Sequence, residues 1–189
     1  MSGVLLYVIG ASGSGKDSLM RHARETLAGD SRVVFAHRYI TRPHDAGGEN
    51  HIALSEAEFN ARVERKLFSL HWSSHGLHYG IGCELNHWLA KGLTVVLNGS
   101  RAHLPDASRN YPELRPVLIE VSPEVLQTRL HARGRENIFD IESRLLRTRQ
   151  FERLQHAKLI RFPNDAPLPQ TGPAFVELVR AQTRTIPCT

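Results

Sequence analysis

Cysteine and long apolar runs are both scarce in this sequence. Its two cysteines, Cys83 and Cys188, have no metal-ligand spacing and form no disulfide framework, so we expect two free thiols. No window approaches the roughly 18 consecutive apolar residues of a membrane span. The N-terminus also lacks the basic stretch and apolar core of a signal peptide. These absences argue against a membrane protein and a disulfide-stapled domain, and we expect a cytoplasmic protein.

Lysine is scarce as well, because only four of the 24 basic residues are lysines and the rest are arginines. Arginine binds phosphate through a planar fork that donates two parallel hydrogen bonds. The net charge of +5 favours anionic ligands, although an arginine-rich source genome would produce the same composition. The chain has no recognised nucleic-acid motif and no interleaving of aromatic and basic residues. We therefore expect a phosphorylated small molecule as ligand, with no nucleic acid and no membrane as partner.

The order of apolar segments predicts an α/β fold. A length of 189 residues is typical of one domain. The continuous apolar run from Val4 to Ile9 is typical of a strand buried on both faces of a parallel sheet. Strand-like segments alternate with helical ones, and this alternation predicts a doubly wound parallel sheet. The other expected strands cover residues 32–37, 67–72, 94–97, 116–121 and 159–162.

Helices are expected where capping residues precede helical spacing. Ser55 and Glu58 form a capping box, and Ser122 followed by Pro123 marks a second helix start. The polar stretch 38–51 and the segment 78–80 are expected to be turns. The remaining expected helices cover residues 18–27, 84–90, 141–155 and 174–183.

The segment GASGSGK at residues 10–16 matches the G-x-x-x-x-G-K pattern of a phosphate-binding loop between a strand and a helix. Backbone N–H groups of such a loop point at phosphate oxygens, and the following helix adds the positive end of its dipole. Lys16 is expected to reach the β- and γ-phosphates of ATP. The expected ATP-binding residues are Gly10, Ala11, Ser12, Gly13, Ser14, Gly15, Lys16, Asp17 and Ser18.

Asp17 occupies the position where this pattern normally has a Ser or Thr that binds magnesium. A carboxylate next to a triphosphate is repulsive unless a cation lies between them, and Mg²⁺ prefers oxygen ligands. We favour Asp17 as a Mg²⁺ ligand, directly or through water. The alternative is that Asp17 only supports the loop while Ser18 or water binds the metal.

Four further segments give the chain its family resemblance: YITRP (39–43), GGE (47–49), HYG (78–80) and RGRE (133–136). Together with the loop they resemble the guanylate kinase family, over residues 4–166. The resemblance implies a single P-loop kinase domain (1–189) with a small substrate-binding insertion and an arginine lid. The core would comprise residues 1–37 and 92–189, the insertion about 38–91 and the lid about 133–142.

The sequence departs from that family in the segments that recognise the guanine base of the substrate. The corresponding segments, LFSLHW (67–72) and LNGSR (97–101), carry no carboxylate. Arg38 and His51 stand where the family has a Ser and a phosphate-binding Tyr. This pattern suits a small, phosphate-rich acceptor. It resembles a branch of these kinases that acts in bacterial phosphonate breakdown, where ATP extends the 1-phosphate of ribose 1,5-bisphosphate to a diphosphate.

The resemblance implies a role for each site residue. Arg42 would clamp the acceptor phosphate and Tyr79 would hydrogen-bond it, while Arg133 and Arg135 would act as catalytic lid arginines beside Lys16. Glu49 is either a carboxylate that orients Arg42 or a solvated turn residue. Asn164 and Asp165 would lie near the adenosine end. The other expected substrate residues are Arg38, His51, Asn98, Arg101 and Arg144, and Arg129 is expected on the ATP side.

The expected reaction needs no general base, because an acceptor phosphate oxygen is already ionised at neutral pH. Alignment and charge neutralisation by Lys16, Mg²⁺ and the lid arginines would carry catalysis. Three alternatives stay open at this point: a guanylate or other nucleoside monophosphate kinase, a kinase-like interaction module without catalysis, and a nucleic-acid-binding protein. A homodimer is also compatible with the sequence.

Overall fold

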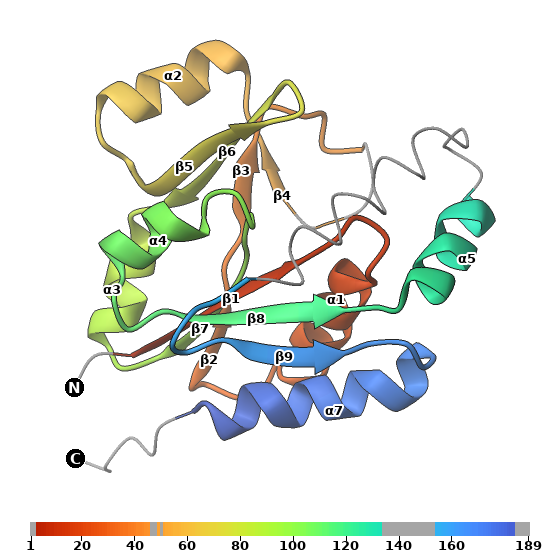
Figure 1. Ribbon diagram of the computed structural model, residues 1–189. Helices are drawn as coiled ribbons and strands as arrows, with labels where there is room; N and C mark the ends of the chain where they lie inside the picture. Colours follow the sequence, from red (N-terminus) through yellow and green to blue (C-terminus); the bar gives the residue numbers. More distant parts are fainter. Residues whose placement is uncertain (1–2, 46–48, 50, 134–153, 184–189) are drawn as a thin grey trace.

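The computed structural model describes residues 3–45, 49, 51–133 and 154–183 (Figure 1). Its larger sheet has five parallel strands in the order β2-β7-β1-β8-β9. This order places β1 at the centre and brings the carboxyl ends of all five strands to one edge. The prediction of a parallel, doubly wound sheet is confirmed. The strands are β1 (Val4–Gly10), β2 (Val33–Phe35), β7 (Thr94–Asn98), β8 (Arg115–Glu120) and β9 (Ile160–Pro163).

Helices cover both faces of this sheet because successive residues of β1 point to opposite sides. Leu6 and Val8 pack with α1 (Lys16–Thr26) and α7 (Leu168–Ala181) on one face. Leu5 and Tyr7 pack on the other face with α3 (Glu84–Ala90) and α4 (Leu104–Asn110). The remaining long helix, α5 (Pro123–Arg133), lies beyond the carboxyl end of β8 (Figure 1).

A second, four-stranded sheet lies above the first (Figure 1) and has the strand order β4-β3-β6-β5. Its strands are β3 (Arg38–Ile40), β4 (His51–Ala53), β5 (Phe68–Ser74) and β6 (Leu77–Gly82), and α2 (Glu56–Glu64) packs beside them. Leu70, Trp72 and Ile81 of this sheet belong to the same buried cluster as Tyr7 and Leu97. The second sheet is therefore seated on the core.

The two expected turns differ in outcome. The stretch 38–51 has bends and turns at 41–45, but its ends form β3 and β4, which pair in parallel. The expected turn at 78–80 is wrong, because these residues lie inside β6. The true turn of the β5–β6 hairpin contains His75 and Gly76, whose φ angles of 51° and 73° are left-handed. Glycine in HYG suggested a turn, but Gly80 is buried against the ring of Phe68. A side chain there would collide with that ring.

Helix boundaries also differ in places. The helix α4 was not predicted, and α7 begins at Leu168 although its sequence suggested a start at Ala174. Prolines cluster in the first part of α7, where the first N–H groups have no partner within the helix, so Pro169 costs little there. Most of the expected helix 141–155 lies outside the described residues. Within the described part of the chain, no helix is long and apolar enough to cross a membrane.

Candidate active site

The loop between β1 and α1 has the geometry of a phosphate cradle. Gly13 and Gly15 adopt left-handed φ angles of 90° and 82°, which favour glycine. Gly15 is also the N-cap of α1, and a side chain at this position would meet Asn164 at 2.6 Å. The loop therefore ends at a helix N-terminus, where backbone N–H groups attract anions.

Two side chains hold this loop from the far side. Asn164 Nδ2 donates a 2.7 Å hydrogen bond to the carbonyl of Ser14. Arg129 Nη1 donates to the same carbonyl at 3.4 Å, and its Nη2 donates to the carbonyls of Asp165 and Ala166. The hydroxyl oxygen of Ser14 is buried and has no hydrogen-bond partner among the described residues. An orphaned hydroxyl inside the loop fits a phosphate oxygen as its partner, so the residues present fit ATP.

Lys16 lies at the centre of a hydrogen-bond network. Its Nζ donates to Asn98 Oδ1 at 2.5 Å and to Asp17 Oδ1 at 3.0 Å. Asn98, the last residue of β7, donates from Nδ2 to Asp17 Oδ1 at 3.0 Å. Lys16 and Asn98 are thereby fixed side by side where the central strands end, which is where open α/β sheets bind ligands.

Burial and pairing shift the pKa values of the two charged residues in this network. Burial lowers the pKa of Lys16 below its ordinary value, and the neighbouring Asp17 opposes that shift. Burial raises the pKa of Asp17, but the charge and hydrogen bond of Lys16 outweigh it, so this pKa lies below its ordinary value. Asp17 is therefore a carboxylate at neutral pH, and its side chain is 45% exposed.

Glu49 joins this network to the second sheet. Asn98 Nδ2 donates to Glu49 Oε2 at 2.9 Å, and Arg38 Nε donates to the same oxygen at 2.8 Å. Arg38 Nη2 also bonds to Glu49 Oε1, which completes a bidentate pair. The side chains of Arg38 and Glu49 are each only 13% exposed. The solvated-turn alternative for Glu49 is wrong, and its main partners are Arg38 and Asn98, with Arg42 at 4.0 Å.

Arg42 is held by His51, which lies opposite it across the β3–β4 connection. His51 Nε2 lies 3.2 Å from the carbonyl of Arg42, and its Nδ1 lies 3.4 Å from Arg42 Nη2. The same Nδ1 also lies 3.2 Å from the carbonyl of Glu49, so the ring contacts the backbone on both sides of the connection. His51 therefore positions Arg42 in this structure.

Tyr79 stands in β6, opposite Trp72 of β5. The two rings are stacked with centroids 5.5 Å apart, and the guanidinium carbon of Arg38 lies 4.9 Å from the Tyr79 ring centroid. The Tyr79 hydroxyl has no hydrogen-bond partner in the described part of the chain. Arg38 therefore contacts both the Glu49 carboxylate and an aromatic face, which fixes it beside the cleft.

The turn after β7 is shaped by Tyr7. Its buried hydroxyl donates to the carbonyl of Ser100 at 3.2 Å and accepts from the N–H of Ser100 at 3.0 Å. Burial raises the pKa of Tyr7 to about 12, although the Ser100 hydrogen bond opposes this. Gly99 packs so closely on the Tyr7 ring that a Cβ there would lie 2.2 Å from a ring carbon. This contact fixes the direction in which the chain leaves Asn98.

Arg101, which was expected beside Arg38, lines a different cavity. That cavity lies between the loop after β7 and the start of α5, and Ala11, Ser122 and Leu126 share its wall. Among the remaining predicted residues, the side chain of Arg133 and all of Arg135 and Arg144 lie outside the described residues.

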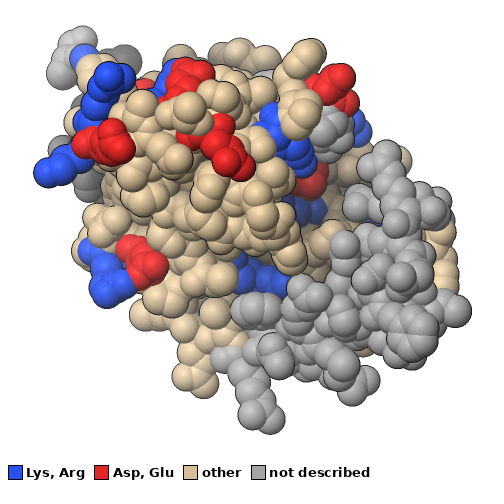
Figure 2. Space-filling model, turned by 90° about the horizontal axis from the view of Figure 1, so that it is seen from above, with Lys and Arg blue, Asp and Glu red and all other residues tan. Residues whose placement is uncertain are grey.

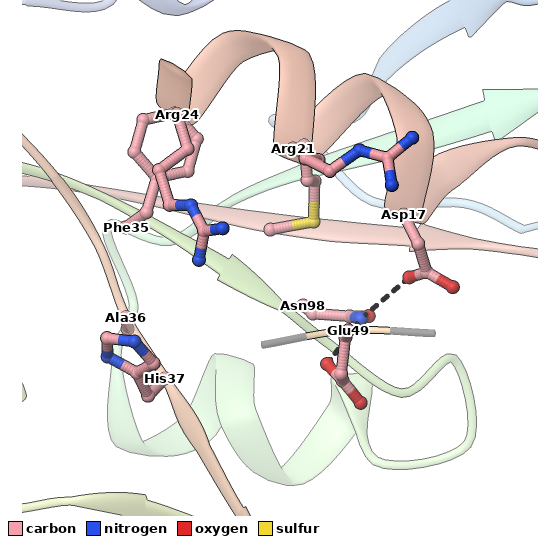
Figure 3. A pocket seen from close by; sticks show the side chains of 9 residues that line it. Asp17, Arg21, Arg24, Phe35, Ala36, His37, Glu49 and Asn98 are labelled. Carbon is pink, nitrogen blue, oxygen red and sulfur yellow. Dashed lines mark hydrogen bonds between the residues drawn. The ribbon is translucent and has the colours of Figure 1, made fainter. Parts of the chain in front are cut away.

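The predictions missed a pocket beside the network. Arg21 and Arg24 of α1 and His37 after β2 line it together with Asp17, Glu49 and Asn98 (Figure 3). Seen from above, acidic and basic side chains lie together in a hollow near the centre of the face (Figure 2). The spacing of Asp17, Arg21 and Arg24 by four and three residues places them on one helix face. That spacing was the available signal in the sequence.

No protein-family model matches the chain. Curated relatives match over nearly its whole length and are named ribose 1,5-bisphosphate phosphokinase PhnN. The protein of Thiobacillus denitrificans is 59% identical over 94% of this chain and 93% of its own length. That of Desulfomicrobium baculatum is 55% identical over 95% of both chains.

A solved structure supports the fold separately. The guanylate kinase of Anaplasma phagocytophilum superposes with a TM-score of 0.66 over 97% of this chain and 88% of its own, at 16% sequence identity. This confirms the guanylate-kinase-like fold. The curated relatives are 46–59% identical over most of the chain, and this similarity shows the family as well as the fold. The chain belongs to the ribose 1,5-bisphosphate phosphokinase PhnN family.

Proposed function

We propose that this protein is a kinase that transfers the γ-phosphoryl group of ATP to the 1-phosphate of ribose 1,5-bisphosphate. The products are 5-phosphoribosyl 1-diphosphate and ADP. The observation that carries the proposal is the continuous network from Lys16 through Asn98 and Glu49 to Arg38. It links a phosphate-binding loop to a second cationic site, as a reaction between two phosphate groups requires. The names of the relatives support the same substrate.

The reaction needs positioning more than covalent help. An oxygen of the acceptor 1-phosphate forms a bond to the γ-phosphorus, and the bond from that phosphorus to the β–γ bridging oxygen breaks. The loop N–H groups and Lys16 hold the donor phosphates and neutralise charge as the group transfers. Arg42 and Tyr79 would hold the acceptor phosphate, while the pair with Glu49 keeps Arg38 in place.

Several roles in this proposal rest on the family resemblance and on local geometry. Arg129 would support ATP indirectly through the loop carbonyl that it contacts. Arg133 and Arg135 would act as lid arginines over the phosphates, and Arg144 would face the substrate. Arg101 would act at the nucleotide side, because it lines the cavity that also contains Ala11 and Ser122.

A nucleoside monophosphate as acceptor is less well supported. The segments that would read a guanine base, at 67–72 and 97–101, contain no carboxylate. The two carboxylates beside Asn98, Asp17 and Glu49, are already paired with Lys16 and Arg38. The acceptor site is therefore built around cations, and the structural likeness to a guanylate kinase extends to the fold alone.

A substrate panel with ATP, followed by ³¹P NMR, tests the proposal. Ribose 1,5-bisphosphate should lose its 1-phosphate resonance and gain the two coupled resonances of a diphosphate, while its 5-phosphate resonance persists. GMP and AMP should give only slow turnover. Turnover of GMP comparable to that of the sugar bisphosphate would overturn the assignment, and a product extended at the 5-phosphate would overturn the regiochemistry.

Magnesium fits the loop through Asp17. Within the described residues no group of three or more His, Cys, Asp or Glu side chains forms a closed metal site. In phosphoryl transfer Mg²⁺ usually takes one or two carboxylates, with phosphate and water as its other ligands. Asp17 Oδ1 accepts from Lys16 and Asn98, and the half-exposed carboxylate leaves Oδ2 for such a role. Bound Mg²⁺ would offset negative charge between the phosphates.

Replacing Asp17 with Ala should raise the Mg²⁺ concentration needed for half-maximal activity by about 10- to 100-fold, the range for groups that support a bound metal. The measurement is the initial rate as a function of free Mg²⁺ at saturating ATP. Asp106→Ala, at an exposed acid of α4 that pairs with Arg109, is the matched control. Unchanged Mg²⁺ dependence in Asp17→Ala would leave Asp17 with a supporting role only.

A further inference from the structure

The pocket that was not predicted from the sequence has two arginines on one wall. Arg21 and Arg24 reach into it from α1, and the guanidinium of Arg24 points toward the space between His37 and Glu49 (Figure 3). Neither guanidinium has a hydrogen bond or ion pair with any described residue. Most other described arginines near the site, such as Arg38, are paired. The Arg21 guanidinium lies near Asp17 and that of Arg24 points toward His37, so the two groups are apart in this structure (Figure 3). Because the two arginines are three residues apart on one helix face, their long side chains can turn toward a single anion between them.

The carboxylates in the pocket do not neutralise these arginines. Glu49 is already paired with Arg38, and Asp17 is paired with Lys16. Arg21 and Arg24 therefore have no ion pair of their own with the described carboxylates of the pocket. Glu49 and Asn98 form the opposite wall, whereas Asp17 lies on α1 with the arginines. The pocket thus has cationic groups at one end and hydrogen-bond acceptors at the other.

The pocket is continuous with the site proposed for the acceptor. Glu49 and Asn98 line it and also belong to the network that holds Arg38 beside Tyr79. Arg42 lies 4.0 Å from the same Glu49 carboxylate. A ligand that fills both the pocket and the acceptor site would place one phosphate group in each, because guanidinium groups bind phosphate. The part of the ligand between the two phosphates would carry hydroxyl groups, which donate to carboxylates.

We propose that Arg21 and Arg24 bind the second phosphate of the acceptor, the 5-phosphate that does not react. The ribose hydroxyls then face Glu49 and Asn98, and the reacting 1-phosphate lies toward Arg42 and Lys16. This inference rests on the proposed function, because it names the part of that substrate that each wall recognises. It makes Arg21 and Arg24 specificity-determining residues for bisphosphorylated over monophosphorylated pentoses.

Binding of two half-substrates tests this assignment without turnover. Calorimetry with ribose 5-phosphate and with ribose 1-phosphate would compare the wild type with Arg21→Ala, Arg24→Ala and the double variant. Each charged hydrogen bond removed should weaken ribose 5-phosphate binding by about 10- to 100-fold, from the usual strength of such bonds. Ribose 1-phosphate binding should change by less than about threefold, because its phosphate contacts other residues.

Kinetics give the second readout. With ribose 1,5-bisphosphate, the Ala variants should raise KM for the sugar by about the same factor as they weaken ribose 5-phosphate binding. Both kcat and KM for ATP should stay nearly unchanged. Lys in place of Arg should restore part of the lost affinity. Arg180→Ala is the matched control, because Arg180 is an exposed helical arginine of α7 paired with Glu177. Its parameters should equal those of the wild type.

The outcomes separate the two proposals. If the wild type does not turn over ribose 1,5-bisphosphate, the proposed function fails whatever the variants do. If the wild type does turn it over, but Arg21→Ala and Arg24→Ala weaken both half-substrates equally or neither of them, the pocket assignment is overturned while the function stands. Selective loss of ribose 5-phosphate binding supports the assignment.

Discussion

Replacing Lys16 with Met should lower kcat by about 10²- to 10³-fold, with a smaller change in KM for ATP. Removing one donor that meets charge developing in a transition state has this order of effect. The Lys16 side chain is only 14% exposed and is held by Asn98 and Asp17, so it is oriented before substrate arrives. A preorganised charge costs no rearrangement at the moment of transfer. Steady-state kinetics with ATP and the sugar bisphosphate measure the effect.

Lys91→Met is the matched control for this experiment, because Lys91 is the exposed C-cap of α3. It should leave kcat unchanged. Lys16→Met should also remain folded, since methionine fills much of the same volume and removes a buried charge. A kcat within about threefold of the wild type in a folded Lys16→Met protein would show that the loop lysine does not act on the transferring group.

Replacing Glu49 with Ala should have the largest effect on stability, about 2–3 kcal/mol of unfolding free energy, and should raise KM for the acceptor at least tenfold. Removing one partner of a fully buried ion pair costs about 3–5 kcal/mol, because it leaves an uncompensated charge. The Arg38–Glu49 pair is slightly exposed, so a somewhat smaller cost is expected. The loss also removes one of the two acceptors for Asn98 Nδ2. Urea unfolding and acceptor kinetics measure the two effects.

Glu177→Ala gives the comparison for this second experiment. Glu177 and Arg180 form an ion pair on α7 with side chains 67% and 45% exposed, and such surface pairs contribute less than about 1 kcal/mol. If Glu49→Ala destabilises the protein no more than Glu177→Ala does, the network around Arg38 is not a structural link between the two sheets.

Much of the fold could be predicted from local patterns in the sequence. The apolar run of β1, the glycine loop and the helical spacing of α1 lie within one short segment, so each supports the others. The helix start at Ser55 is confirmed, since its hydroxyl accepts the N–H of Glu58, whereas the Glu58 carboxylate accepts from Arg62. The wrong turn at 78–80 has a tertiary cause, because Gly80 makes room for the ring of Phe68.

The site was harder to predict because its contacts join distant segments. The Glu49–Asn98 hydrogen bond and the Lys16–Asn98 hydrogen bond depend on how two sheets meet. The motif suggests that Glu49 orients Arg42, whereas its closer ion pair in the structure is with Arg38. Arg101 shows the same limit, since its place after β7 did not reveal that the chain turns toward α5 there.

The close packing of Gly99 on Tyr7 has a consequence for how this protein tolerates change. The Tyr7 ring occupies the space that any side chain at position 99 would need. A larger residue at position 99 therefore requires a smaller residue at position 7. Replacing Tyr7 in this way would remove both hydrogen bonds between its hydroxyl and the backbone of Ser100. A larger residue at position 99 is therefore expected only in relatives that have a smaller residue at position 7, so a core residue limits which residues can follow Asn98.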